Sequence, residues 1–366
     1  MADRLTADAG FRQAAELRLI AADIHWAWRF GWDAARGDAA LGIPALCLTS
    51  PLSLIIYEAR RYLARIDPAL PLRYAEFIEQ ARHRIKLFDD THRGMEGIIE
   101  SAEAIIAAHR SHYVGLAGRS ADDLGLYEYR GKLICTSHVA QFDIGTPPDF
   151  IGADDRTATS RGIGFEFGQY IRSLGDPIRE IFSDWDWDGQ SFLTTYDEGR
   201  VDFIDVVADN YYEERSGAGL SAGIILALEI CLCKLNTIEV LLSDDPSPWS
   251  VEFLFKLRYV TLFHILRGLA ELRAERAQNL TQGQVDLLGR LEEHPTTLLL
   301  LSQPGKWLRN ALVHYQIAYQ VPTSVLDYSR PFAGLVEFYF FRDFAVVAAE
   351  IREHAESVAQ ELDQWF

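Results

Sequence analysis

The stretch of sequence that decides the fold is residues 220–242, LSAGIILALEICLCKLNTIEVLL. It is nearly all apolar and is interrupted by Glu229, Lys234, Asn236 and Glu239. A membrane-spanning helix needs about 20 apolar residues with few or no charges, and three charged residues fall inside this run. A helix that is apolar all round is instead buried on every side. The stretch therefore predicts the central buried helix of a globular protein, with no membrane insertion.

Helical patterns continue through the C-terminal half of the chain. Residues 247–278 predict a long helix, because Ser-Pro at its start supplies an N-cap and a first-turn proline. Residues 281–293 predict a short helix that begins with a threonine cap, and residues 341–364 carry apolar side chains at spacings of three and four. A further helix follows Pro304-Gly305 and its region ends at Pro322. This half of the chain is therefore predicted to be a helical bundle.

The N-terminal part is also predicted to be helical. Apolar residues recur with the helical period over about 11–36, 52–64 and 71–88, and again from residue 90 or 91 to about 112. Prolines and polar residues interrupt the pattern between these segments. We therefore expect four helices in the first 112 residues.

The helical period fails in the middle of the chain. Residues 126–136 have aromatic and β-branched side chains on the two sides of Arg130-Gly131, which predicts a short β-hairpin, and residues 145–160 are predicted to be a loop. The predicted fold is mainly α: a helical bundle with an additional N-terminal helical region and a small β and loop insertion. We place the boundaries at 1–112, 113–215 and 216–366.

The most informative polar motif lies on the predicted helix after Pro304. Its sequence is KWLRNALVHY, residues 306–315. On a helix, Asn310 and His314 stand at i and i+4 on one face, and Arg309 lies about 100° round and can reach the same groove. His264, on the 247–278 helix, is either a core histidine or a second group that faces this groove. The spacing predicts a polar cluster of a cation, an amide and an imidazole.

The pattern Arg309, Asn310, three further residues and His314 resembles the signature of the HEPN superfamily, whose members are all-helical. The resemblance covers about ten residues. It implies a metal-independent endoribonuclease in which His314 acts as general acid or base and Arg309 holds the phosphate. In this arrangement Asn310 orients either the imidazole or the phosphate. Lys306 and Tyr315 flank the motif and are the predicted substrate-binding residues.

The resemblance also implies partners and a cellular role. HEPN helices of this kind pair across a two-fold axis, so a homodimer is implied, or a pseudo-dimer with the N-terminal helices. Members commonly act as toxins or in antiphage defence, which implies an antitoxin or a defence partner protein. Those paired with a nucleotidyltransferase antitoxin carry a tyrosine two residues after the histidine, whereas here Tyr315 follows directly and Gln316 takes that place. Control by modification of that tyrosine is therefore not expected.

The charge pattern restricts where RNA can bind. The formal net charge is −18, which excludes a surface that attracts nucleic acid everywhere. The window 295–326 nevertheless contains no Asp or Glu, although the overall acid content would place about five there. This window surrounds the motif, so any RNA site is expected to be local.

The sequence contains other candidate motifs. Gly219 to Gly223 matches the Gly-x-Ser-x-Gly elbow of serine hydrolases, with Ser221 as the nucleophile, but no strand precedes it and no parallel sheet is predicted around it. The glycine run 162–168 has the wrong spacing for a phosphate loop, and the histidines of the first 112 residues lack metal-ligand spacing. We assign no cofactor and no metal. A non-catalytic module that binds RNA or a protein through the same Arg and His remains the principal alternative.

The compartment follows from the start of the chain and from its cysteines. The first eight residues, MADRLTAD, are polar and acidic, which predicts no signal peptide. The four cysteines show no Cys-x-x-Cys pair. A cytoplasmic protein is expected.

Overall fold

The computed structural model describes residues 2–365 except 36–41, 75, 89–92, 118–123, 145–155, 188–195, 216–218, 243–247 and 327–329. Within these residues the chain forms fifteen α-helices and three strands, so the mainly α prediction is confirmed. In the N-terminal part these are α1 (Ala2–Ala35), α2 (Gly42–Cys47), α3 (Thr49–Ile66), α4 (Glu76–Leu87) and α5 (Gly94–Ala117). The middle holds β1 (Leu124–Tyr129), β2 (Lys132–Thr136), α6 (Ser137–Ile144), α7 (Arg156–Ile181), β3 (Val201–Val206) and α8 (Ala208–Arg215). The remainder is α9 (Ala222–Leu242), α10 (Pro248–Arg276), α11 (Gln282–Glu293), α12 (Pro295–Leu301), α13 (Gln303–His314), α14 (Pro331–Phe340) and α15 (Phe344–Asp363).

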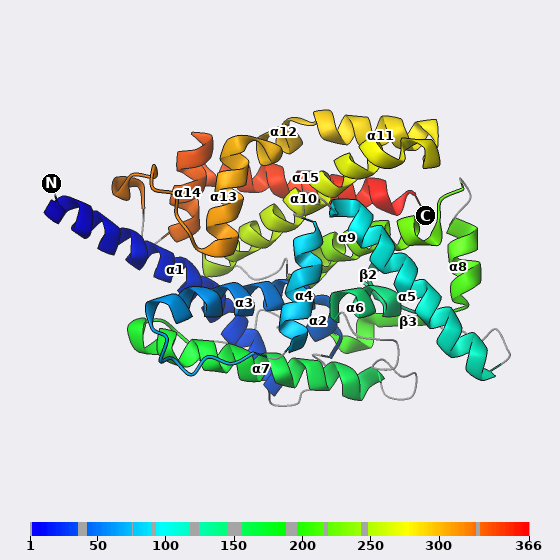
Figure 1. The fold of residues 1–366 in the computed structure, drawn as a ribbon, viewed down its shortest axis with the longest axis horizontal. Helices are drawn as coiled ribbons and strands as arrows, with labels where there is room; N and C mark the ends of the chain where they lie inside the picture. The colour runs from blue at the N-terminus through cyan, green and yellow to red at the C-terminus, as the bar shows by residue number, and fades with distance from the viewer. Residues whose placement is uncertain are drawn as a thin grey trace.

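Helix α9 is the buried centre that the sequence predicted (Figure 1). Three of its polar residues are bonded to neighbouring elements: Lys234 Nζ donates to Asp143 Oδ1 at 2.6 Å, and Asn236 Nδ2 donates to the carbonyl of Leu133 at 2.9 Å. Glu239 accepts from Lys132 at 2.6 Å. Buried charges persist only when they are paired, which explains why an apolar helix carries these residues.

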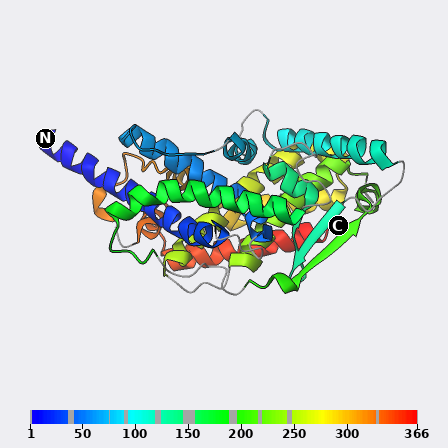
Figure 2. The same cartoon turned by 90° about the horizontal axis from the view of Figure 1, so that it is seen from below.

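One continuous hydrophobic core runs through all three predicted segments. Helix α1 lies along α7, and α3 packs against both α4 and α13, so N-terminal helices contact the motif helix (Figures 1 and 2). No helix among the described ranges combines the length and the apolar character needed to cross a membrane.

The sheet has the order β2-β1-β3, with both pairings antiparallel. Arg130 and Gly131 have φ of 54° and 71°, as a two-residue hairpin turn of type I′ requires, so the predicted hairpin is confirmed. Strand β3 was not predicted. Its central residues, Asp202 to Asp205, are exposed, so the apolar alternation that identifies a strand is missing.

Several helix predictions needed correction. Helix α2 is a fifth helix in the N-terminal part, and α7 begins at Arg156, where the sequence predicted loop as far as residue 160. The glycine run 162–168 lies inside α7. Helix α14 was missed, and the closing helix begins at Phe344 rather than 341. The predicted Ser247 cap lies outside the described residues.

Candidate functional site

The motif helix α13 is fixed at both ends. The Ser302 side chain accepts from the Gly305 amide at 3.2 Å and caps the start of the helix, where Tyr259 also donates to the Gly305 carbonyl at 2.9 Å. The helix ends at Tyr315, whose φ of 54° is left-handed. Because both ends are held, the polar side chains between them project from a fixed scaffold.

Arg309, Asn310 and His314 lie together at one side of α13. Arg309 Nη1 donates to Asn310 Oδ1 at 3.0 Å and lies 3.4 Å from His314 Nε2. Asn310 is exposed and the other two are half-buried, with 27% of the His314 side chain exposed. The structure therefore places Arg309 within hydrogen-bond distance of both Asn310 and His314, at a position that solvent reaches.

A carboxylate from α3 completes the cluster. Glu58 Oε2 lies 3.0 Å from His314 Nδ1, and the two residues are 256 positions apart in the chain. Only 2% of the Glu58 side chain is exposed. A carboxylate accepts hydrogen bonds, so it selects the form of His314 that carries a proton on Nδ1. In the neutral imidazole, Nε2 is then an acceptor that faces the Arg309 guanidinium.

Arginines set the charge of Glu58. Arg82, on α4, donates to Glu58 Oε1 from Nε at 3.0 Å and from Nη2 at 2.6 Å, and Arg61 Nη1 lies 3.7 Å from Oε2. Burial by itself raises the pKa of Glu58, but the hydrogen bonds and charges of His314 and Arg82 outweigh it, so the pKa lies below its ordinary value. Glu58 is therefore an ionised carboxylate at neutral pH.

A second imidazole lies behind Arg309. His264, on α10, is buried, and its Nε2 lies 3.3 Å from Arg309 Nη2. Burial, followed by the charges of Arg267 and Lys234, lowers the pKa of His264 to about 3. It is therefore neutral at physiological pH and accepts from Arg309 through Nε2. Burial likewise lowers the pKa of Arg309 to about 10, so the guanidinium remains charged.

The two predicted substrate-binding residues lie in different surroundings. Lys306 is exposed one turn before Arg309 on the same helix. Tyr315 is fully buried, and its hydroxyl donates to Asp23 Oδ2 at 2.6 Å. Asp23 also pairs with Lys256 in the core. Lys306 is therefore placed to meet a ligand, whereas Tyr315 is turned into the core, away from any ligand at the surface.

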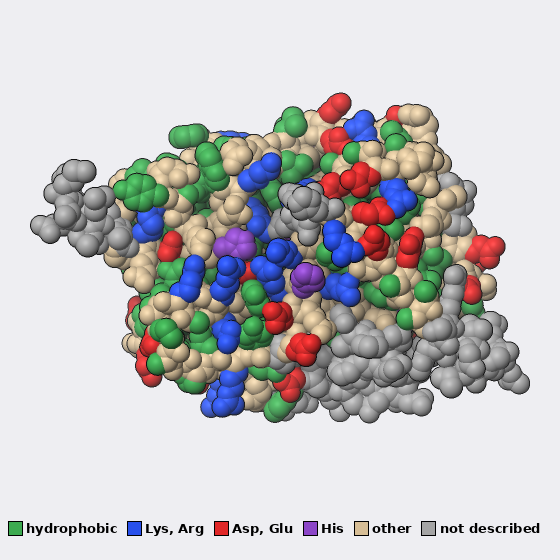
Figure 3. Space-filling view, viewed as in Figure 1, with side chains coloured by type: hydrophobic (Ala, Val, Ile, Leu, Met, Phe, Trp, Pro, Cys, Tyr) green, Lys and Arg blue, Asp and Glu red, His purple; other side chains and the backbone are tan. Residues whose placement is uncertain are grey.

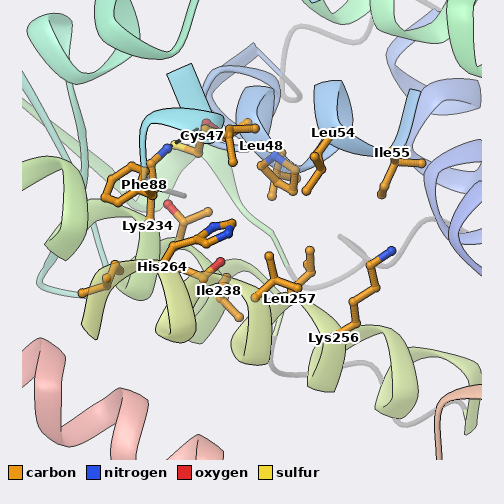
Figure 4. Close-up of a pocket in the computed structure, with 17 residues that line it drawn as sticks. Cys47, Leu48, Leu54, Ile55, Phe88, Lys234, Ile238, Lys256, Leu257 and His264 are labelled. Carbon is orange, nitrogen blue, oxygen red and sulfur yellow. Dashed lines mark hydrogen bonds between the residues drawn. The ribbon is translucent and has the colours of Figure 1, made fainter. Parts of the chain in front are cut away.

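A small cavity lies beside His264 (Figure 4). Its volume is about 60 Å³ and its wall is mostly apolar. Figure 4 shows His264 on its wall together with Lys234 and Lys256. The two lysines are paired with Asp143 and Asp23 respectively. The cavity thus adds apolar surroundings to His264 and no unneutralised charge.

The remaining motifs have structural placements. Ser221 precedes α9, and its Oγ accepts from the Ile224 amide at 3.3 Å, which is the role of a helix cap. The sheet is antiparallel, so the described residues offer no parallel sheet on which a nucleophile elbow would sit. In the acidic and aromatic sequence DWDW, residues 184–187, both tryptophans pack edge-on against His25. Across the described ranges, no group of three or more His, Cys, Asp or Glu residues has the geometry of a metal site.

Sequence reasoning missed two members of the cluster and left a third open. Glu58 and Arg82 lie on helices that were predicted, but nothing in the sequence indicated that these helices meet α13. The sequence allows His264 to be either a core residue or a residue of the groove, and in the structure it is both buried and in contact with Arg309. The isolated acid in the sequence EARR, residues 58–61, is the one local signal that could have pointed to a neutralised carboxylate.

Comparisons with protein-family models, with curated protein sequences and with solved structures found no match.

Proposed function

We propose that this protein is a metal-independent endoribonuclease of the HEPN type. The observation that carries the proposal is the chain of contacts from Glu58 through His314 to Arg309. It places a partly exposed imidazole with one nitrogen on a buried carboxylate and the other beside a guanidinium. A carboxylate that orients an imidazole is a recurring arrangement for acid–base catalysis.

The chemistry follows from the two faces of His314. Nε2 removes the proton of a ribose 2′-OH, whose oxygen attacks the adjacent phosphorus while the bond from phosphorus to the 5′ oxygen breaks. Water protonates the leaving 5′ oxygen. Arg309 binds the phosphate oxygens and the charge that develops on them. The products are a 2′,3′-cyclic phosphate and a 5′-OH.

The local charge supports an anionic ligand. Arginines from α3 and α4 and Lys306 from α13 lie around the site, although the chain as a whole is strongly acidic. In Figure 3, Lys and Arg side chains gather around the histidines at the centre of the face. A local basic surface on an acidic protein favours phosphate binding at this face.

The oligomer, the partner and the cellular role rest on the resemblance alone, and the compartment rests on the first residues and the cysteines. A homodimer, an antitoxin or defence partner, a role as a toxin or in antiphage defence and a cytoplasmic location are part of the proposal. The alternative of a pseudo-dimer gains one supporting observation, because the N-terminal helix α3 itself supplies Glu58 to the motif helix.

A non-catalytic binding module is the second candidate. It is favoured by the contacts that Arg309 already makes with Asn310, His314 and His264. These contacts use both N–H groups of Nη1, so a phosphate reaches Nη1 only in exchange for Asn310 or His314. If that exchange does not occur, the site binds RNA without cleaving it.

Incubation of purified protein with total RNA in EDTA tests the proposal. Cleavage should persist in EDTA and leave 2′,3′-cyclic ends, whereas DNA, which lacks the attacking 2′-OH, should stay intact. His314→Ala should lower the rate by about 10²- to 10⁴-fold, the usual contribution of a general acid or base, and Arg309→Ala should also lower it strongly. His294→Ala, an exposed histidine that stacks on His354, is the matched control.

The opposite results are equally clear. Cleavage that requires added Mg²⁺, or that continues undiminished in both site variants, would show that this cluster is not the catalyst. RNA binding without cleavage by the wild-type protein would establish the binding module instead.

A further inference from the structure

Surface cations around the site have fewer carboxylate partners than many surface cations elsewhere on the protein. On other parts of the surface, arginines and lysines commonly pair with carboxylates. Such pairs are Arg93–Glu100, Lys132–Glu239, Arg273–Glu292, Arg276–Glu96, Arg330–Glu337 and Arg342–Glu350. Near the site, one buried carboxylate, Glu58, serves both Arg61 and Arg82. This region therefore carries an excess of positive charge that its own acids do not neutralise.

Five cations make up this region, which we call the basic band: Arg61 and Arg65 on α3, Arg82 and Lys86 on α4, and Lys306 on α13. Arg65, Lys86 and Lys306 are exposed and have no carboxylate partner among the described residues. The side chain of Arg61 is 59% exposed. Four of the five cations, all except the half-buried Arg82, therefore face solvent.

Helical spacing places the band on one face. Arg61 and Arg65 are one turn apart on α3, as are Arg82 and Lys86 on α4, so each pair points to the same side about 6 Å apart. Helix α3 packs against both α4 and α13, and Glu58 contacts Arg82 on one side and His314 on the other. The cations thus continue outward from His314 along two helices. Figure 3 shows this concentration of Lys and Arg around the centre of the face.

We propose that the basic band binds the sugar–phosphate backbone of single-stranded RNA beyond the cleaved phosphate. The inference rests on the proposed function for the position of that phosphate, but the binding surface stands on its own charges. Exposed cations without partners can meet phosphates without first breaking an ion pair. The substrate is then a strand of several nucleotides, and its flexibility lets the 2′-OH of one nucleotide align with the leaving oxygen.

Binding is measured first, separately from cleavage. A fluorescent RNA of about twelve nucleotides, within the range of known single-strand site sizes, is titrated into the His314→Ala protein at several salt concentrations between about 50 and 200 mM. Arg65→Gln with Lys86→Gln should weaken binding and reduce the slope of log K against log salt by roughly 1.4, because each phosphate contact on a single strand contributes about 0.7. Both side chains are exposed, and thermal unfolding checks that the variant is folded.

The control removes the same charge elsewhere. Arg200→Gln with Arg342→Gln changes two surface arginines that pair with Asp197 and Glu350, outside the basic band. It should leave the slope and the affinity unchanged. Equal slopes for the band variant and the control variant would overturn the inference.

Cleavage then separates this inference from the proposed function. In the protein with His314 intact, the band variant should lose more activity on the long RNA, through a higher KM, than on a dinucleotide. If the wild-type protein cleaves both substrates and the band variant cleaves them as well as the control variant does, the proposed nuclease activity stands and the proposal that the basic band binds RNA is refuted. If the wild-type protein binds RNA through the basic band and does not cleave it, the proposed nuclease activity is refuted and the proposal that the band binds RNA stands.

Discussion

Glu58→Gln tests the orientation of His314 most directly. Glutamine has the shape of glutamate but replaces one oxygen with an NH2 group. Arg82 donates two hydrogen bonds to Oε1, at 3.0 and 2.6 Å, so the remaining oxygen of glutamine will stay on the Arg82 side. The NH2 group then faces His314 Nδ1, which must become an acceptor. The proton moves to Nε2, where it opposes the Arg309 Nη1 donor at 3.4 Å.

The expected effects on activity and stability come from the same contacts. A His314 with its proton on Nε2 cannot accept the 2′-OH proton, so cleavage should fall by about 10²- to 10⁴-fold. The two hydrogen bonds from Arg82 change from a charged to a neutral acceptor, and the hydrogen bond from His314 to the carboxylate is replaced by a neutral one from the glutamine NH2 to Nδ1. Each loses about 1 kcal/mol, so the free energy of unfolding should fall by about 3 kcal/mol.

The pH dependence of this loss has a definite sign. The pKa of Glu58 in the folded protein lies below its ordinary value of 4.5. Its ionised form therefore adds stability that is complete above about pH 4.5 and is lost as the pH falls through the folded-state pKa. The difference in unfolding free energy between wild type and Glu58→Gln should be constant above that pH and shrink below it.

Nitrogen NMR and urea unfolding measure these outcomes. The ¹⁵N shifts of the His314 ring report which nitrogen carries the proton, independently of any RNA cleavage. Glu100→Gln is the control, because Glu100 forms an exposed pair with Arg93 and should cost less than about 0.5 kcal/mol. A His314 that keeps its proton on Nδ1 in Glu58→Gln, together with a stability equal to that of the control, would refute the reasoning.

Two further predictions concern buried polar groups outside the cluster of Glu58, His314 and Arg309. Tyr315→Phe removes the hydroxyl that donates to Asp23 at 2.6 Å and should lower the unfolding free energy by about 2 kcal/mol in urea, while a change below about 0.5 kcal/mol would show that the bond is not needed. The second concerns His354. Burial and, to a smaller extent, the charge of His294 lower the pKa of His354 to about 4. Its neutral form therefore adds stability above pH 6.5 that is lost as the pH falls toward 4, and His354→Gln should reduce the slope of stability against pH in that window by up to about 1.4 kcal/mol per unit; equal slopes would exclude His354.

Elements with strong local signals were predictable from the sequence. The capping box at Thr281 has both of its hydrogen bonds, to and from Gln284, and α11 begins where the sequence placed it. The turn at Arg130-Gly131 set the hairpin register because only a few residue pairs adopt two positive φ values readily. In both cases the determinants lie within four residues of one another.

Elements defined by partners were not predictable. Strand β3 exists because it pairs with β1, and four of its six residues are exposed, so it leaves no pattern in its own sequence. The same is true of the site. The motif identified Arg309, Asn310 and His314 from spacing along one helix. Glu58 and Arg82 belong to the cluster because α3 packs on both α4 and α13, which spacing along the chain cannot express.

The position of His314 depends on contacts from the far end of the chain. Asp23, on α1, accepts from Tyr315, the residue after His314, and holds Lys256 of α10 in the core. Arg12 donates to the carbonyls of Ala318 and Val321 at 2.7 and 2.9 Å, which ties the segment after the motif to the same helix. Because α3 also supplies the carboxylate, the first 66 residues both hold the end of α13 and orient its imidazole. A chemical unit whose motif lies within ten residues therefore requires helices from both halves of the chain.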